Sequence, residues 1–554
     1  MAQDLLTVIV GGEAGHGVKK SGTVISTVMN ELGRYVFEMD DYQSLIRGGH
    51  NFSVVSSSIS RLYSHYMSTD ILVCLDKRSV DIHKGRLKEG GSLVYNEDAV
   101  QLESGTGLPM STWIRELKGI PPMAGTFGVA AVSVLCGLDL SVIERIFQRS
   151  YPRGLEANVE LARRTYEAMK ADKGKFPLET GDGKPGSLFA GNEAIALGAA
   201  AAGLDVYIAY PMTPSSSLLH FLAAQSRRLG IAVLHPENEI AVINMALGSA
   251  YAGARTAVGS SGGGFALMHE AFSLAGMSET PILVILSSRP GPSTGVPTYT
   301  AQGDLDFALN VGHGEFPRIV LSPSGTNQAF EKAGELLNLV WKFQIPGILL
   351  TEKHLSESVM TTNIDPASIE APDPALYDGP PEQYDRYEGT DSGISPMLFP
   401  PVEGAVIKSN SYEHDQKGIT TEEAERIAEM QERRHRKEEV IRNEVKNLRT
   451  VATFGEGSHS LVTYGSTTLS ALEAVKHVDD VKVVQVIYLR PFPDWALREA
   501  VSDSKMIAAE LSVSGQFEDL LRSKGFDVAA RIRRYDGRPF DPPELASRIR
   551  EVTQ

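Results

Sequence analysis

The sequence predicts an α/β protein that contains several doubly wound domains. Strand-like apolar runs alternate with helix-like segments over most of the chain, and a glycine-rich turn follows the first run. The chain has 554 residues, of which 42% are hydrophobic, so it is too long for one ordinary core and too apolar for disorder. Alternating strands and helices form parallel sheets covered on both faces, and three or four such domains are expected.

The first domain is expected over residues 1–172, followed by a linker over residues 173–188. The linker combines glycine, proline and charge without any period. Apolar runs and helical spacing predict the elements of the domain. The expected strands are 5–10, 35–37, 51–56 and 71–74, and the expected helices are 19–32, 126–136 and 140–148.

A second domain is expected over residues 189–362 and a last one over residues 451–554. The same patterns predict their elements. The strands of the second domain are 205–209, 231–234, 282–287, 319–322 and 347–350, with helices from 215 and over 237–252; the strands of the last are 461–463, 482–486 and 505–510.

Residues 363–450 are predicted to form an irregular excursion and a charged helix. The first part is rich in proline and glycine and is expected to wrap a partner or a neighbouring domain. Residues Thr420 to Glu423 fit a capping box that opens a helix ending near Leu448. Because QERRHRKEE in its middle has no apolar face, this helix is predicted to bridge elements in solvent.

Composition excludes several classes of partner. The chain carries 53 Lys and Arg against 69 Asp and Glu, a net charge of -16 without a long basic run, so neither nucleic acid nor an anionic membrane is expected to bind it. No signal peptide follows Met1 and no apolar stretch approaches a membrane span, so a cytoplasmic location is expected. Cys74 and Cys136 are too few for a disulfide framework or an iron–sulfur cluster. Both are expected in the core, and no metal site is predicted in this chain.

The glycine turn near the N-terminus leaves three roles open. Gly12, Gly15 and Gly17 lie between a strand and a helix, where backbone amides can approach a phosphate. A nicotinamide cofactor would use Glu38 or Asp40 as its ribose acid, although the glycine spacing is reversed from the usual fingerprint. The turn could also be purely structural, or it could bind another phosphate-bearing ligand. Arg47 follows on a Gly-rich bend, where it could meet phosphate, a partner domain or solvent.

Candidate functional residues of the second domain follow its predicted strands. Thr213 is expected to cap the helix after 205–209, with Pro214 at its first position. Glu237 and Glu239 open the next helix, and only one of them is expected to enter a shared site because their side chains diverge. Arg289 follows the strand 282–287, where a guanidinium can bind a carboxylate bidentately.

Taken together, these motifs resemble the 2-oxoacid:ferredoxin oxidoreductase family, in its two-subunit type with fused gamma and alpha segments. The segments that carry the resemblance are YPMTPSSS (210–217), ENEIAVINMALGSAYAGARTAVGSSGGG (237–264), SSRPGPSTGVPT (287–298), LSVSGQ (511–516) and YDGRPF (535–540). The resemblance covers nearly the whole chain. It implies a Rossmann-like gamma domain, a pyrimidine-type thiamine diphosphate domain and a transketolase C-terminal-like domain. His16 stands where the family more often has Gln.

The resemblance also implies a division of labour between two polypeptides. The alpha segment holds the aminopyrimidine of thiamine diphosphate, while a beta subunit carries its diphosphate, Mg and a four-iron cluster that passes electrons to ferredoxin. By similarity Glu239 activates the cofactor, Tyr210 and Pro211 adjoin it, Thr213 contacts the substrate and Arg289 pairs with the substrate carboxylate. Gly15, Gly17 and Arg47 are implied contacts of coenzyme A. A dimer of heterodimers is the implied assembly.

Two other classes of function remain possible on the sequence alone. A nicotinamide-dependent dehydrogenase would explain the first glycine turn, and a scaffold subunit would need no working site. The sequence does not name the 2-oxo acid, although 2-oxoglutarate and pyruvate are favoured. Ser293 and Thr298 are predicted to line the substrate pocket, with Thr294 and Tyr299 beside them.

Overall fold

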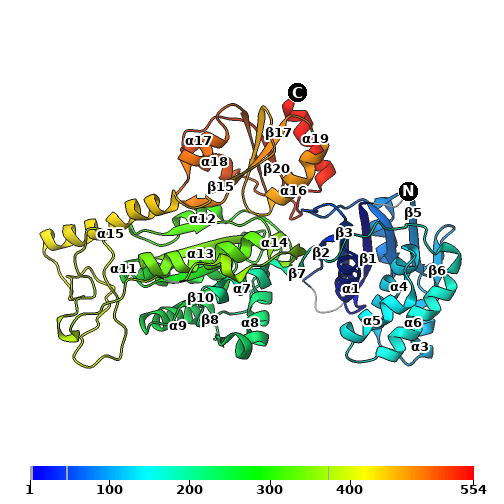
Figure 1. The fold of residues 1–554 in the computed structure, drawn as a ribbon, viewed down its shortest axis with the longest axis horizontal. Helices are drawn as coiled ribbons and strands as arrows, with labels where there is room; N and C mark the ends of the chain where they lie inside the picture. Colours follow the sequence, from blue (N-terminus) through cyan, green and yellow to red (C-terminus); the bar gives the residue numbers. More distant parts are fainter. Residues whose placement is uncertain (1–3, 45–47, 372) are drawn as a thin grey trace. The chain divides into compact units, whose positions relative to one another are not determined.

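The computed structural model describes residues 4–44, 48–371 and 373–554. The chain divides into two compact units (Figure 1). The first comprises residues 1–190, 357–363 and 541–545, and the second comprises residues 191–356, 364–540 and 546–554. The fold class is α/β, as predicted. Among the described residues, the helices are too short or too polar to cross a membrane, and no group of three or more His, Cys, Asp or Glu could hold a metal ion.

The first unit is built on an eight-stranded sheet in the order β6-β5-β4-β1-β3-β2-β14-β7. The strands are β1 (Leu6–Glu13), β2 (Tyr35–Asp41), β3 (His50–Ser58), β4 (Thr69–Cys74), β5 (Leu87–Asn96), β6 (Thr106–Leu108), β7 (Ser187–Ala190) and β14 (Val359–Thr362). The helices are α1 (Val18–Glu31), α2 (Lys77–His83), α3 (Met110–Glu116), α4 (Gly125–Leu135), α5 (Leu140–Ser150) and α6 (Leu155–Ala168). Apolar side chains of β1, β4, α1 and α4 form its core, in which Cys136 takes part, and both cysteines are buried free thiols.

Strand directions in this sheet are mixed rather than wholly parallel. β1 is parallel to β4 but antiparallel to β3, and β2 and β3 are antiparallel to each other. The physical reason is loop length, because only residues 42–49 separate β2 from β3 and a parallel crossover needs a dozen residues or more. The last two strands at one end of the sheet, β14 and β7, come from distant parts of the chain. β7 pairs with β14, and β14 pairs with β2, so both ends of the segment 189–362 contribute to this sheet.

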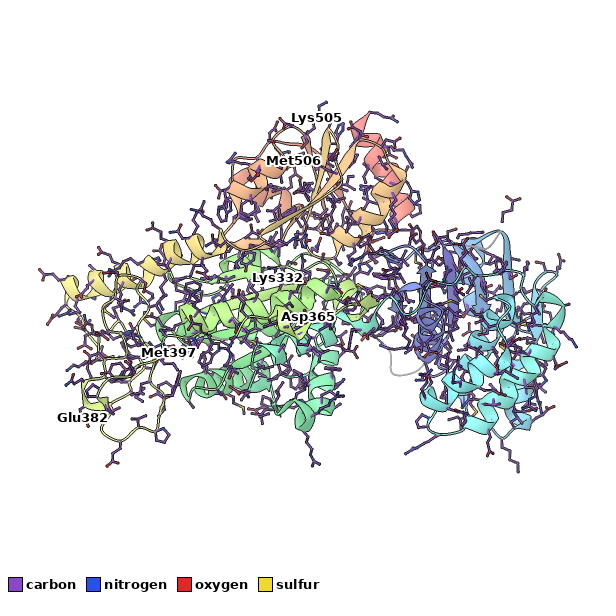
Figure 2. The ribbon with its side chains drawn as sticks, viewed as in Figure 1. Lys332, Asp365, Glu382, Met397, Lys505 and Met506 are labelled. Atoms are coloured by element: carbon purple, nitrogen blue, oxygen red, sulfur yellow. The ribbon has the colours of Figure 1, made fainter. Side chains whose placement is uncertain are left out.

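The second unit contains a seven-stranded sheet, β18-β12-β13-β11-β10-β8-β9, and a five-stranded sheet, β15-β17-β16-β19-β20. The strands of the larger sheet are β8 (Val206–Ile208), β9 (Ala232–Leu234), β10 (Thr256–Ser260), β11 (Ile282–Ser288), β12 (Ile319–Leu321), β13 (Pro346–Glu352) and β18 (Tyr488–Arg490). Those of the smaller sheet are β15 (Val451–Phe454), β16 (His459–Thr463), β17 (Val481–Val486), β19 (Lys505–Glu510) and β20 (Val528–Arg533). Figure 2 labels Lys505 and Met506 at the start of β19.

The helices of this unit alternate with its strands, as predicted. They are α7 (Gly191–Ala201), α8 (Ser216–Leu229), α9 (Glu239–Tyr251), α10 (Gly262–Leu267), α11 (His269–Met277), α12 (Leu305–Asn310), α13 (Thr326–Phe343), α15 (Ala424–Val445), α16 (Thr467–Ala474), α17 (Asp494–Ala500) and α18 (Gln516–Ser523). Two further helices, α14 (Lys353–Glu357) and α19 (Pro542–Thr553), have residues in both units. One continuous hydrophobic core joins residues of both sheets, from Ile208 to Val528.

The structure corrects the prediction for the charged helix. α15 begins at Ala424 with Glu423 as its N-cap and no side-chain capping bond, so the predicted capping box is absent from this helix start. The helix does not bridge elements in solvent, because Arg433, Arg434 and Lys437 are buried along with three apolar side chains. Figure 1 shows the irregular segment in yellow beside α15. This segment has its own packing: Met397, labelled in Figure 2, is buried and its backbone bonds to Ala375 and Tyr377.

Candidate active site

Four loops of the second unit leave the same edge of its larger sheet. Strands β9, β8, β10 and β11 are adjacent and parallel. Parallel strands place their carboxyl ends together, and in open α/β sheets ligands bind at this edge. The loops that begin there hold the segments singled out in the sequence: 209–215 after β8, 235–239 after β9, 261–264 after β10 and 289–298 after β11.

Glu239 is the first residue of α9, and its side chain is only 3% exposed. Asn238 caps the helix, because its Oδ1 accepts a hydrogen bond from the backbone amide of Ala241 at 2.9 Å. The Glu239 carboxylate therefore belongs to the first turn of a capped helix. Its Oε1 has no hydrogen-bond partner among the described residues, although it is buried. A buried carboxylate oxygen without a donor is costly, so this atom is suited to a donor on a ligand.

The glycine turn after β10 makes room for that carboxylate. A Cβ added to Gly264 would lie 2.4 Å from Oε1 of Glu239 and 2.1 Å from Oγ of Ser260. Ser260 is the last residue of β10, and its hydroxyl lies 3.9 Å from Sδ of Met212 in the loop after β8. Three of the loops therefore meet around Glu239.

Arg289 and Thr213, predicted to act on the same substrate, are brought together. Arg289 donates a hydrogen bond from Nη1 to the backbone carbonyl of Thr213 at 2.7 Å. Asp304 is the nearby acid, and it accepts a hydrogen bond from Oγ of Ser288 at 2.6 Å. Burial raises the pKa of Asp304, against the opposing effects of Ser288 and Arg289. Burial also lowers the pKa of Arg289, an effect that Asp304 partly offsets.

Thr213 does not cap the helix that follows it, contrary to the prediction. α8 begins at Ser216, with Ser215 at the N-cap position and Pro214 outside the helix. Residues 213–215 form a turn before the helix, so the N-cap lies two residues later than predicted. The carbonyl of Pro214 accepts a hydrogen bond from Nδ2 of Asn192 at 2.8 Å, so the loop is held from outside the helix.

Comparison with known proteins is consistent with this geometry. Residues 197–433 match the family model described as pyruvate flavodoxin/ferredoxin oxidoreductase, thiamine diphosphate-binding, and residues 7–168 match that described as pyruvate ferredoxin/flavodoxin oxidoreductase. The chain is 30% identical to the alpha subunit of 2-oxoacid:ferredoxin oxidoreductase 2 from Aeropyrum pernix, over 99% of this chain and 98% of that one. The chain belongs to the 2-oxoacid:ferredoxin oxidoreductase family.

Other relatives agree with that assignment to the alpha subunits of the 2-oxoacid:ferredoxin oxidoreductases. The chain is 27% identical to the 2-oxoglutarate synthase subunit KorA of Methanocaldococcus jannaschii, over 64% of this chain and 96% of that one. The solved structure of 2-oxoglutarate:ferredoxin oxidoreductase from Magnetococcus marinus, with 2-oxoglutarate, coenzyme A and succinyl-CoA bound, superposes with a TM-score of 0.91 at 28% identity and covers 100% of both chains.

The remaining predicted residues of this oxidoreductase subunit lie in different surroundings. Thr298 is 4% exposed and its Oγ1 has no hydrogen-bond partner among the residues described, whereas Ser293 is exposed. Tyr210 is exposed and meets the His235 ring edge-on at 5.7 Å between centroids, and Pro211 is half-buried. Thr298 is therefore the better placed of the two predicted pocket residues to bond to a buried ligand.

Two residues of the site could not be found from sequence motifs alone. Asp304 precedes α12 like an ordinary N-cap, yet it makes no capping bond and faces Ser288 instead. Asn192, at the start of α7, reaches the loop after β8, and its Oδ1 is buried without a partner in the described part of the chain. Their partners are 16 and 22 residues away in sequence, and local spacing gives no signal for such contacts.

In the first unit, the glycine turn is only partly open to a ligand. Gly15 has a φ of 100° and a Cβ there would meet no atom within 4 Å, but at Gly17 a Cβ would lie 2.1 Å from the carbonyl oxygen of Pro122. Gly17 is therefore required by packing. Arg47 lies outside the described residues. Glu38 is buried beneath α1, where burial raises its pKa to about 8, so it does not offer a carboxylate to a nicotinamide ribose.

Proposed function

We propose that this chain provides the aminopyrimidine side of a thiamine diphosphate site for the coenzyme A-dependent oxidative decarboxylation of a 2-oxo acid. The observation that carries the proposal is Glu239, a buried carboxylate at a helix start whose Oε1 lacks a donor among the described residues. It lies where a thiamine diphosphate-binding family model covers the chain. The products would be an acyl-CoA and CO2, with the electrons passed to ferredoxin.

The residues around Glu239 fit the aminopyrimidine of thiamine diphosphate. A ring nitrogen that donates a hydrogen bond would satisfy Oε1, and the absent side chain of Gly264 leaves the carboxylate its space. When bound, the cofactor supplies the carbon nucleophile and the electron sink that 2-oxo acid decarboxylation requires. The role of Glu239 is to hold a proton at the pyrimidine ring nitrogen, and Tyr210 and Pro211 border the same space.

Arg289 and Thr298 support the assignment of a 2-oxo acid as substrate. A guanidinium at the carboxyl end of β11 can pair with the substrate carboxylate, and its bond to the Thr213 carbonyl fixes its direction. Thr298 offers a free hydroxyl, while Thr213 and Ser293 lie in the adjoining loops. The relatives named for 2-oxoglutarate favour 2-oxoglutarate over pyruvate as the substrate.

A beta subunit would complete this site and bring the iron–sulfur cluster. The apolar side chains exposed around the edge that holds Glu239 are unusual for a free surface. They are Tyr210, Leu234, Ile240, Met245, Leu267 and Val296. A partner covering them would carry the diphosphate, Mg and the four-iron cluster, because Cys74 and Cys136 are buried and too few to bind one. We propose that two such heterodimers assemble in the cytoplasm and reduce ferredoxin.

Coenzyme A is proposed to contact the first unit at the open part of its glycine turn. Gly15 leaves its backbone accessible just before α1, where amides can bind phosphate. The phosphate-binding role left open by the sequence is thereby assigned to coenzyme A, with Arg47 as a further contact. Gly17 would act indirectly, by holding the turn against Pro122.

The test is a matched pair of substitutions in the complex of this chain with its partner subunit. Glu239→Gln keeps the shape of the side chain but cannot hold the ring proton in the same way, so 2-oxo acid-dependent reduction of viologen should fall at least ~100-fold. Glu237→Gln is the control, because Glu237 is exposed and lies two residues before the helix start. It should retain the parent rate.

Size-exclusion chromatography of both variants would show whether the complex still assembles. Viologen reduction by assembled Glu239→Gln at the parent rate would refute the assignment of Glu239.

A further inference from the structure

A second cavity lies in the second unit, away from the loops of the active site. It has a volume of about 740 Å³, within the range of small-molecule sites. Residues of α12, α15, α18 and the loops around β12 and β18 line it. Arg318 directly precedes β12 and therefore lies at the amino end of that strand. Strands β12, β13 and β11 are parallel, and the active site lies at the carboxyl ends of such strands. The cavity and the active site are therefore at opposite edges of the sheet.

Arg318 is a buried cation at the wall of this cavity. Its side chain is 5% exposed, stacks on the Phe316 ring at 4.1 Å and donates from Nη1 to the Val311 carbonyl. Its Nε has no hydrogen-bond partner among the described residues, and the acid that acts on its charge, Glu438, pairs with Arg490 at 3.5 Å. Burial lowers its pKa to about 10. A buried charge whose nearby acid is shared with a second cation is costly, and an anion in the cavity would relieve that cost.

The other charged groups of the cavity limit which anion can enter. Arg490 pairs with Glu438 at 3.5 Å, and Arg442 pairs with Asp494 at 2.7 Å, so both are already neutralised. Asp306 also lines the cavity, and the nearby Asp519 adds to the effect of burial in raising its pKa. Lys524 also lines the cavity, but it is exposed, so Arg318 is the buried cation of the lining. A polyanion would be repelled by Asp306 and Asp519, whereas a single oxyanion group can bind Arg318.

The apolar part of the lining indicates the rest of the ligand. Leu489 and Phe492 are buried side chains of the cavity wall, and Ile441 and Leu520 join them from α15 and α18. Together they offer an apolar surface next to the buried guanidinium of Arg318. The required ligand has one carboxylate and an apolar body.

We propose that this cavity binds a small apolar monocarboxylate, anchored by its carboxylate on Arg318. The ligand joins α15, α12 and α18, elements that come from three separate stretches of the chain. The site is independent of the proposed thiamine diphosphate site and of the substrate carboxylate bound at Arg289.

Isothermal titration of the full-length chain with phenylacetate tests the proposal. One equivalent should bind, the uncharged 2-phenylethanol should bind at least tenfold more weakly, and Arg318→Gln should raise the dissociation constant for phenylacetate at least tenfold. Arg228→Gln is the matched control, because it removes an exposed guanidinium on α8 and should leave the constant unchanged. Arg289→Ala should also leave it unchanged, which separates this site from the substrate site.

Should Arg318→Gln fail to fold, Ser523→Trp provides a second variant. Ser523 is exposed at the cavity rim, so an indole there would block the cavity without touching Arg318. It should abolish phenylacetate binding while the melting temperature stays the same. Equal binding by Ser523→Trp or Arg318→Gln would overturn the proposal, as would loss of binding in Arg289→Ala. Tighter binding of inorganic phosphate than of phenylacetate, dependent on Arg318, would overturn the assignment to a carboxylate.

Discussion

Gly264 is the position where the proposed site leaves no space for a side chain. Its Cα faces both the Ser260 hydroxyl and the Glu239 carboxylate, whose Oε1 would lie 2.4 Å from an added Cβ. Real Cβ atoms do not approach oxygen so closely, so one of the two polar groups would have to move. The neighbouring Gly263 differs, because the nearest atom to its Cβ would be the Ser293 carbonyl oxygen at 3.7 Å.

Gly264→Ala is therefore expected to displace the Glu239 carboxylate and weaken thiamine diphosphate binding at least tenfold. Gly263→Ala, on the same helix, makes the same chemical change with ordinary van der Waals contacts and should bind the cofactor as the parent does. Titration of the cofactor into the assembled complex, followed by its effect on viologen reduction, measures both. Equal affinity in the two alanine variants would show that the carboxylate position is not set by Gly264.

The position of a single residue could be predicted where that residue lies in the loop after a predicted strand. Arg289 lies directly after β11 and Glu239 lies at the end of the loop that follows β9, and parallel strands bring such residues to one edge. Asp304 was not predictable, because its role depends on Ser288 and Arg289 lying beside it in space. The helix start at Ser216 was missed because Thr213 followed by Pro214 fits the usual pattern of an N-cap and first helical residue, whereas the turn over residues 213–215 moves the N-cap to Ser215.

At the scale of elements, α15 shows how a charged helix can be a packed one. Its residues Arg433 and Lys437 both form ion pairs with Glu279, a buried residue just after α11. Lys437 also donates to the Phe343 carbonyl at 2.9 Å, and Arg386 donates to the Glu279 carbonyl at 2.7 Å. A single acid therefore compensates a group of buried cations, whose positive charge holds the pKa of Glu279 well below its usual range despite burial.

Glu279→Gln should destabilise the second unit by about 3–5 kcal/mol near neutral pH, because it leaves the buried cations without their counter-ion. Since the folded pKa of Glu279 lies below its ordinary value of 4.5, its contribution is present above that pH and is lost as the pH falls below it. Urea unfolding at pH 7 and pH 4 should show a smaller difference from the parent at pH 4.

The control for this charge change is Glu432→Gln on the same helix. Glu432 is exposed, so its substitution should change the free energy of unfolding by less than about 0.5 kcal/mol. A Glu279→Gln protein as stable as the Glu432→Gln protein at pH 7 would show that the buried ion pairs do not hold α15 in place.

The prediction that α15 lies in solvent was wrong because the period of apolar residues does not reveal buried cations. Met430, Ile441 and Val445 are buried, but the residues between them on the same face are cations whose partner lies about 150 residues earlier in the chain. A counter-ion at that separation leaves no trace in local spacing. Long apolar runs, such as those of β1 and β11, have no such ambiguity and were predicted correctly.

At the scale of the whole molecule, segments that are neighbours in sequence do not always belong to the same sheet. β7 and β14 border the segment 189–362 in sequence, yet both belong to the sheet of the first unit. Each has only four residues, too few to show a period. β18 likewise comes from the last segment but pairs with β12 in the larger sheet of the second unit. Sequence patterns located most strands, but they could not assign these three short strands to their sheets.

The shared core of the second unit depends on a buried glutamine that joins the two sheets. The side chain of Gln302 donates to the Tyr464 carbonyl at 3.0 Å, and its Oε1 accepts from the Thr467 hydroxyl at 2.8 Å and the Leu511 amide at 2.9 Å. Its backbone amide donates to the Leu511 carbonyl at 2.8 Å. Hydrogen bonds from the side chain and the backbone of Gln302 therefore connect Tyr464, Thr467 and Leu511 to the loop after β11.

Gln302→Ala should lower the free energy of unfolding of the second unit by about 2–4 kcal/mol, because it leaves three buried polar groups unpaired. Since both sheets pack into one core, hydrogen exchange should speed up together in β11 of the larger sheet and β16 of the smaller one. Amides of β1 in the first unit, which has a separate core, serve as the internal control. Faster exchange in β16 alone, with β11 unchanged, would mean that the last segment unfolds as an independent domain.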